Sequence, residues 1–273
     1  MKRVVKAMGL THEIVGIRFI VLKTEYLQCT ATEMKDTTIA ELVKLAGEGR
    51  FVKADAHSFR ELIDAWSLGL VPVPEDTLSA RYEYANGTYA SFSVAREVFA
   101  NRQYISQQIY GVELAPVTEL DDTDIVISIG TAKDMMRLMQ GYARYYGVAR
   151  NVLTLGCGIC NELITKPFMN NDINVSLLST VDRKVAGFSH DEMGAGFPKH
   201  MLESILQGIL ETVNLTENNG PKKEILARLD DPEELGFPIR MNYDYAIQSL
   251  EYRKYCEACI AQEKREEEMT NGR

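Results

Sequence analysis

Short runs rich in Val and Ile alternate along this chain with longer segments whose apolar residues recur at three and four positions. The short runs have the length and composition of strands, and they are Ile14–Val21, Arg50–Ala54, Gly111–Pro116, Asp124–Ile129, Asn151–Leu155 and Asn174–Leu178. The longer segments are typical of amphipathic helices, and they are Thr37–Ala46, Ser58–Ser67, Thr131–Tyr146 and Lys199–Val213. This alternation predicts an α/β domain in which a mixed or largely parallel sheet is flanked by helices.

Two stretches of the chain resemble each other. Arg50–Ala54 and Asn151–Leu155 are each preceded by a helical pattern ending in glycine, at Gly47 and Gly147, and each is followed by another helical pattern. Glycine is typical of the position after a helix C-terminus. The similarity indicates either a duplicated half-domain or the general likeness of two helix–strand–helix units.

The composition of the sequence changes near Asn214, where Asn, Gly, Pro and Asp residues precede a helical run from about Tyr243 to Glu268. We therefore expect an α/β domain over residues 1–213 and a helical C-terminal appendage over residues 214–273. A tyrosine-rich face of the appendage is expected to pack on the main domain or on a second subunit of a homo-oligomer; its members are Tyr243, Tyr245, Tyr252 and Tyr255.

Charge and composition exclude several classes of protein. Thirty Lys and Arg against 39 Asp and Glu give a net charge of -9, which repels a nucleic-acid backbone. No run approaches the roughly 18 consecutive apolar residues of a membrane helix. The five cysteines are an odd number, and the start of the chain lacks the pattern of a signal peptide, so we expect reduced thiols in a cytoplasmic protein.

Cys157 and Cys160 form a Cys-x-x-Cys pair that follows a predicted strand and opens a helical segment, Asn161–Thr165. The positive end of a helix stabilises a thiolate, so such a pair suits a nucleophile, a redox couple or two metal ligands. The alternative is two small buried residues at a tight junction.

A second pair, Cys256 and Cys259, has helical spacing. Together with Cys157 and Cys160 it supplies the four thiolates that zinc or an iron–sulfur cluster requires. The two pairs lie about a hundred residues apart, outside the spacing of zinc ribbons, so separate inert thiols are the alternative.

His190, Asp191 and Glu192 precede Met193–Pro198, which we interpret as a flexible glycine-rich turn able to close over a ligand. Adjacent carboxylates suit acid–base work, and Glu162 is a further candidate for proton transfer. The alternative is that these acids cap a turn.

Two further positions are candidates for anion binding. Arg183 follows a predicted strand, where a guanidinium is suited to a carboxylate or phosphate. Gly130 and Thr131 open a predicted helix, where free N–H groups attract anions and Thr131 is the expected N-cap. A surface ion pair for Arg183 and helix capping for Thr131 are the simpler alternatives.

Several of these elements, in this order and spacing, resemble a bacterial and archaeal family called domain of unknown function 169. The resemblance runs from about Ile14 to Val213 and rests on Val15–Ile20, Asp124–Gly130, Met135–Met139 ending at Gly147, Cys160–Glu162, Asn174–Leu177, Arg183, Asp191–Glu192 and Gly196–Pro198. It implies an α/β domain and no assigned reaction. The chain departs from the family pattern at Thr38, Ser58 and Ser179, where the resemblance leads us to expect cysteines, while Cys160 is retained.

These features favour a small-molecule enzyme with a site where strand ends meet helix starts. Cys160 is the expected thiol, Arg183 with Gly130 and Thr131 would bind an anionic or carbonyl substrate, and protons would be handled by Glu162, Asp191 or Glu192. One alternative is a zinc or iron–sulfur protein using the four paired cysteines. Another is a non-catalytic ligand-binding or assembly subunit.

Overall fold

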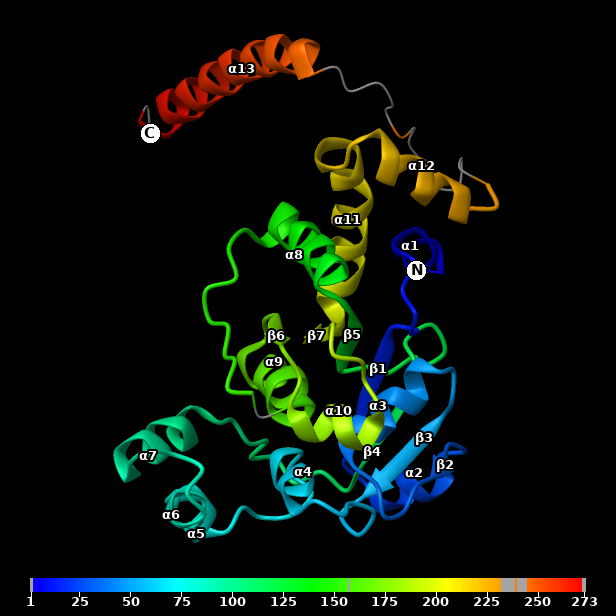
Figure 1. Cartoon of the computed structure of the whole chain (residues 1–273), viewed down its shortest axis with the longest axis vertical. Coiled ribbons are helices and arrows are strands. Elements are labelled where there is room, and N and C mark those ends of the chain that lie inside the picture. Colours follow the sequence, from blue (N-terminus) through cyan, green and yellow to red (C-terminus); the bar gives the residue numbers. More distant parts are fainter. Residues whose placement is uncertain (1, 157, 232–238, 240–244, 272–273) are drawn as a thin grey trace. The chain divides into compact units, whose positions relative to one another are not determined.

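A computed structural model describes residues 2–156, 158–231, 239 and 245–271, within which seven strands form a sheet in the order β2-β3-β4-β1-β5-β7-β6 (Figure 1). The strands are β1 (Val15–Ile20), β2 (Thr32–Glu33), β3 (Val52–Asp55), β4 (Gly111–Pro116), β5 (Ile125–Thr131), β6 (Asn174–Ser176) and β7 (Glu192–Pro198). β2 and β3 pair parallel, whereas each of the other neighbours pairs antiparallel. The prediction of a mixed sheet is confirmed, with antiparallel pairing in the majority.

Helices flank this sheet, as predicted. In chain order they are α1 (Lys2–Met8), α2 (Lys23–Gln28), α3 (Ile39–Gly47), α4 (Leu62–Ser67), α5 (Glu75–Leu78), α6 (Arg81–Ala85), α7 (Phe92–Asn101), α8 (Ala132–Tyr146), the π-helix η1 (Cys160–Thr165), α9 (Lys166–Asn170), α10 (Thr180–Ala186), the 3-10 turn η2 (Lys199–Met201), α11 (Leu202–Thr216), α12 (Asn219–Arg228) and α13 (Tyr245–Asn271). None of the described helices combines the length and apolar composition that crossing a membrane requires.

The hydrophobic core lies between the sheet and the helices that pack on one of its faces. α3 packs on β1, β3 and β4, while η1 packs on β5, β6 and β7, and α4 and α10 contact η1 and α3 respectively. Ile17, Leu114 and Ile127 of the strands are fully buried in one cluster with Leu42 of α3 and Leu163 of η1. Burial of such side chains supplies the main driving force for folding, and it brings the N-termini of α3 and η1 close to one another.

The prediction of a strand at Asn151–Leu155 is wrong, because this segment has no strand ladder. The side-chain amide of Asn174 replaces the ladder: its oxygen accepts from the Leu153 N–H at 2.7 Å and its nitrogen donates to the Leu153 carbonyl at 2.8 Å. The matching segment near Arg50 forms β3. The two similar stretches of sequence therefore have different structures.

The interpretation of Met193–Pro198 as a flexible turn is also wrong, because these residues form β7 between β5 and β6. The glycines serve close packing instead of flexibility. A Cβ atom at Gly196 would lie 1.9 Å from the backbone oxygen of Leu163, and one at Gly194 would lie 2.3 Å from a methyl carbon of the same residue. The backbone of η1 therefore lies directly against the sheet.

Residues 74–102 form an excursion from the sheet that contains α5, α6 and α7 (Figure 1). Ala80, Ala95 and Phe99 make a small apolar cluster of their own, with Tyr89 and Val98 packed against it. This excursion forms one wall of the cleft described below.

The chain divides into two units, Met1–Thr212 and Val213–Arg273. The sheet and the excursion belong to the first unit. The second contains the end of α11, α12 and the long helix α13, so the expected helical run near Tyr243–Glu268 is present from Tyr245 onward. Tyr243 lies outside the described residues.

Candidate functional site

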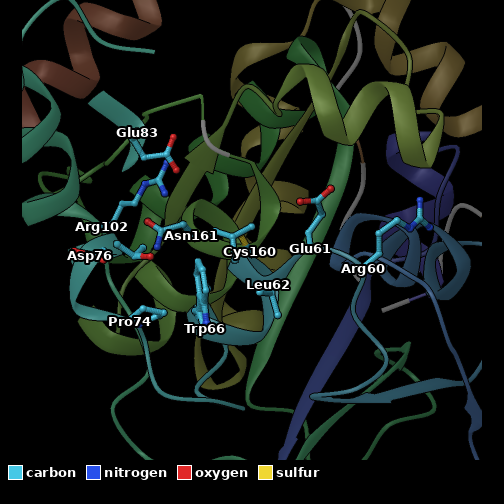
Figure 2. Close-up of a pocket in the computed structure, with 13 residues that line it drawn as sticks. Arg60, Glu61, Leu62, Trp66, Pro74, Asp76, Glu83, Arg102, Cys160 and Asn161 are labelled. Carbon is cyan, nitrogen blue, oxygen red and sulfur yellow. The ribbon is translucent and has the colours of Figure 1, made fainter. Parts of the chain in front are cut away.

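A cleft of about 670 Å³ lies between α4 and the start of η1 on one side and the 74–102 excursion on the other (Figure 2). Its floor includes Cys160 and Asn161, and the single tryptophan of the chain, Trp66, lines it from α4. A second cavity of about 400 Å³ shares Glu61, Ile63, Glu83, Arg102 and Cys160 with the cleft. The side chain of Cys160 therefore borders both spaces.

The smaller cavity lies where three helices begin. It is lined by Thr38 and Ile39 at the start of α3, by Ser179 and Asp182 at the start of α10, and by Cys160 at the start of η1. Thr38 and Ser179 are N-caps whose side chains accept backbone N–H groups of their own helices, so each helix begins at its cap for a local reason.

Cys160 is held at the first position of a π-helix, a rare element that is often found at functional sites. Gly158 makes the tight approach to this helix possible. Its φ of +95° lies in the left-handed region, and a Cβ atom there would lie 2.5 Å from a carboxylate oxygen of Asp182. Another residue at this position would be strained and would push α10 away from Cys160.

Asp64 of α4 lines the smaller cavity together with Cys160, and each group shifts the pKa of the other. The Asp64 carboxylate accepts the Ile39 N–H at the start of α3, at 2.9 Å. Burial raises its pKa from 3.8 to about 7, against the opposing effect of the Ile39 N–H and the Cys160 side chain. A carboxyl group with this pKa exchanges protons readily near neutral pH.

Asp182 connects the starts of α10 and η1. It accepts the Ser179 N–H at 2.7 Å, and its carboxylate lies against Gly158, just before η1. Burial raises its pKa, while the Ser179 N–H and the charge of Arg183 oppose the rise. Asp182 also raises the pKa of Asp64, so negative charge at either group disfavours negative charge at the other.

These surroundings keep the Cys160 thiol protonated at rest. Burial raises its pKa well above 9.0, and the charges of Asp64 and Asp182 raise it further. The hydroxyl of Ser67 and the guanidinium of Arg102 act in the opposite direction, since both stabilise a thiolate. A thiolate at this position therefore requires a base that accepts the proton.

The wall opposite Cys160 is polar. Arg102, at the C-terminal end of α7, lines both cavities, and its guanidinium also lies 4.3 Å from the ring centroid of Phe99. Figure 2 shows the Glu83 carboxylate pointing toward this guanidinium, with Asp76 nearby on the same wall. Trp66 and Leu62 provide apolar surface, so the cleft combines apolar walls with a few charged groups, as ligand sites commonly do.

Of the residues that the sequence singled out for catalysis, Cys160 lines the cleft and Glu162 does not. Glu162 is fully buried and accepts hydrogen bonds from the Leu155 N–H, at 2.5 Å, and from the Ser176 hydroxyl. These contacts tie η1 to β6 and to the segment before Gly156. The catalytic role of Glu162 stays a prediction, and its contacts favour a structural one.

Arg183, Asp191 and Glu192 lie together, but they are not part of the lining that contains Cys160. The Arg183 guanidinium donates to the backbone carbonyls of Ser189, Leu177 and Glu192. Asp191 is exposed and accepts from the Ser189 hydroxyl. The guanidinium thus holds the loop before β7.

The Glu192 side chain is buried at the edge of the same loop. It accepts from the Ser189 N–H at 2.6 Å and lies 2.5 Å from the His12 imidazole. The hydrogen bonds from Ser189 and His12 lower its pKa, against the effect of burial. This carboxylate joins the N-terminal segment to β7, away from the thiol.

Gly130 and Thr131 are also outside the cleft lining. Thr131 is the N-cap of α8, and its hydroxyl and N–H bond the carboxylate of Asp134 in a capping box. The Thr131 donors expected to bind an anion are therefore bonded to Asp134.

The four cysteines expected to hold a metal fall in different parts of the chain. Cys157 lies outside the described residues, and Cys256 and Cys259 belong to the second unit, whose position relative to Cys160 is not defined. Among the residues the structure does describe, no three His, Cys, Asp or Glu side chains are grouped to hold a metal ion.

The sequence interpretation missed Asp64, Arg102 and Trp66. Asp64 and Trp66 belong to a segment that was predicted as an amphipathic helix. An acid on the buried face of such a helix indicates a functional residue, because buried carboxylates are rare, and Asp64 is 4% exposed. Arg102 follows α7, and no local sequence pattern indicates its place in the site, because it meets Cys160 only through the fold.

Two of the three positions where the family resemblance led us to expect cysteines lie beside Cys160. Thr38 and Ser179 line the smaller cavity, whereas Ser58 bonds Asp55 at 3.1 Å and lies outside that lining. In this chain hydroxyl groups therefore occupy positions close to the retained thiol.

The fold and the cleft define an α/β protein with a mixed sheet and a buried thiol at a helix junction. The family model DUF169, described as "Uncharacterised ArCR", matches residues 3–208, and the chain belongs to this family, as the sequence pattern predicted. Comparisons with curated proteins and with solved structures found no match. The match falls within the first unit, which contains the cleft.

Proposed function

We propose that this protein is a small-molecule enzyme in which Cys160 is the reacting thiol and Asp64 is the base that takes its proton. The observation that supports this most is that Cys160 and a buried carboxyl group with a pKa of about 7 line the same cavity, beside an open cleft. A nucleophile beside a base that a third group orients is the usual arrangement for covalent catalysis. Here the Ile39 N–H orients Asp64.

The step that this pair supports is addition to a carbonyl compound. The Cys160 proton moves to Asp64 as the sulfur forms a bond with the carbonyl carbon. The π electron pair of the carbonyl moves to its oxygen, which then takes the proton back from Asp64. Arg102 lies on the opposite wall, where its charge would stabilise the developing oxyanion.

The proposal is tested by the rate at which iodoacetamide alkylates Cys160, followed by mass spectrometry of the Cys160 peptide near neutral pH. Asp64→Asn should slow this alkylation by about tenfold or more, because loss of the base outweighs the lower thiol pKa that loss of the Asp64 charge brings. Cys29, a half-buried thiol elsewhere in the same chain, serves as the internal reference and should be unaffected.

Asp191→Asn is the matched control, since Asp191 is an exposed carboxylate outside the cleft lining. It should leave the rate at Cys160 unchanged. Equal rates in the wild type and in Asp64→Asn, or a Cys160 that is inert in the folded wild-type protein, would show that the thiol is structural and would refute the proposal.

We propose further that the protein acts in the cytoplasm as a homo-oligomer. The described cysteines form no disulfide, which suits a reducing compartment. On α13 the side chains of Tyr255, Ile260 and Met269 are exposed, and such apolar groups suit contact with a second copy. Light scattering of the wild type and of a Tyr255→Glu, Ile260→Glu variant tests this; equal masses at the monomer value would contradict it.

A further inference from the structure

Carboxylates outnumber guanidinium groups around Cys160. Among the described residues of the smaller cavity, Glu61, Asp64, Glu83 and Asp182 are acids and Arg102 is basic. The larger cleft adds Asp76 and Arg60. A ligand that is purely anionic would therefore meet more repulsion than attraction in this space.

Arg60 adds little positive charge to the cleft, because its guanidinium is bound elsewhere. It donates to the Glu41 carboxylate at 2.9 Å and to the Asp36 carbonyl at 2.7 Å. Figure 2 shows its side chain directed away from Cys160. The charge of Arg60 is thus neutralised at the rim, which leaves Arg102 as the guanidinium facing the acids in the described lining.

A buried acceptor provides a second and independent indication. Asn161 is 2% exposed and lines the cleft; its side-chain nitrogen donates to the Gln103 carbonyl at 2.6 Å, but its oxygen has no hydrogen-bond partner in the described part of the chain. Figure 2 shows the Asn161 side chain between Cys160 and the wall of Arg102 and Asp76. A buried acceptor without a partner costs free energy until a donor reaches it.

We infer that the substrate of this cleft carries a protonated nitrogen, which the acids around Cys160 and the Asn161 oxygen bind, beside the carbonyl group that Cys160 attacks. A protonated amine only donates hydrogen bonds, so it matches carboxylates and an unpartnered amide oxygen. The chemical class is a small amino-carbonyl compound. This inference rests on the proposed function, because it takes Cys160 as the reacting group.

Three thiol reagents that differ in charge test the inference on the full chain. They are 2-aminoethyl methanethiosulfonate, which is cationic, methyl methanethiosulfonate, which is neutral, and 2-sulfonatoethyl methanethiosulfonate, which is anionic. Each converts a thiol into a mixed disulfide and releases methanesulfinate. The rates at Cys160 and at Cys29 are measured separately by peptide mass spectrometry, so that Cys29 corrects for the intrinsic reactivity of each reagent.

The cationic reagent should exceed the anionic one at Cys160 by about tenfold or more after this correction, because charge in a cleft concentrates ligands of opposite sign. Glu61→Gln together with Glu83→Gln should reduce the preference. Glu97→Gln is the matched control, since Glu97 is an exposed acid of the same excursion outside both linings, and it should leave the preference intact.

The outcomes separate this inference from the proposed function. If Cys160 reacts with all three reagents in the proportions seen at Cys29, or prefers the anion, the inference is refuted while the reactive thiol stands. If Cys160 reacts with none of them in the folded protein, the proposed function fails, and the inference fails with it.

Discussion

The Asp64 carboxyl group is buried, so its ionisation lowers the free energy of unfolding. Its pKa is about 7 in the folded protein against an ordinary value of 3.8. Between pH 3.8 and about pH 7, Asp64 is therefore protonated to a greater extent in the folded state than in the unfolded state. The stability associated with Asp64 is complete below about pH 4 and is lost as the pH rises through 7.

Asp64→Asn should therefore stabilise the protein at alkaline pH while it removes the proposed base. The difference between the two pKa values corresponds to at most about 4 kcal/mol. We expect a higher melting temperature than wild type near pH 8.5 and a small difference near pH 5, with thermal unfolding as the measurement. A variant that is less stable than wild type at both pH values would show that the carboxylate is needed for packing.

Packing of η1 against β7 leads to a prediction about a single strand. Gly196→Ala places a methyl group against the Leu163 backbone, which cannot move without displacing η1, whereas Gly194→Ala meets a flexible methyl group of the same residue. We expect Gly196→Ala to cost about 3 kcal/mol or more and Gly194→Ala about 1 kcal/mol. Urea unfolding of the two variants measures the difference, and equal costs would contradict this account of β7.

Five of the seven described strands and the long helices α3, α8 and α11 could be predicted from the sequence, because local periodicity indicates them. α3 and α8 begin at Thr38 and Thr131, whose capping boxes are visible in the sequence. β7 could not be predicted from its glycines, since their role depends on Leu163, a residue distant in sequence. Asn151–Leu155 reads as a strand, but Asn174 satisfies its backbone in place of a neighbouring strand.

The site was less predictable than the fold for the same reason. Cys160 is marked by its place at the start of a helix, and that position was predicted from its neighbours. Asp64 and Arg102 reach it from α4 and from the end of α7, and no local pattern indicates which distant side chains will meet a thiol. Asp191 and Glu192 were predicted as site residues because they are adjacent in sequence. In the structure, Glu192 contacts His12 and not Cys160.

At the scale of the molecule, the first unit contains the sheet, the cleft and the whole family match. A chain that ends at Thr216, the last residue of α11, should therefore fold and should retain the iodoacetamide reactivity of Cys160 within about twofold of the full chain. Circular dichroism and the same peptide assay test this. Loss of the Cys160 reaction in a truncated chain that still folds would show that residues 217–273 contribute to the site.

The two walls of the cleft are built separately, since the 74–102 excursion has its own small apolar cluster and the opposite wall belongs to the core of the sheet. The residues that line the cleft therefore come from two different stretches of the chain. Exchanging residues 74–102 with those of another family member would replace the lining residues Asp76, Glu83 and Arg102, while Cys160 and Asp64 on the opposite wall would stay in place. One wall of the cleft can thus vary in sequence without disturbing the core that holds the other.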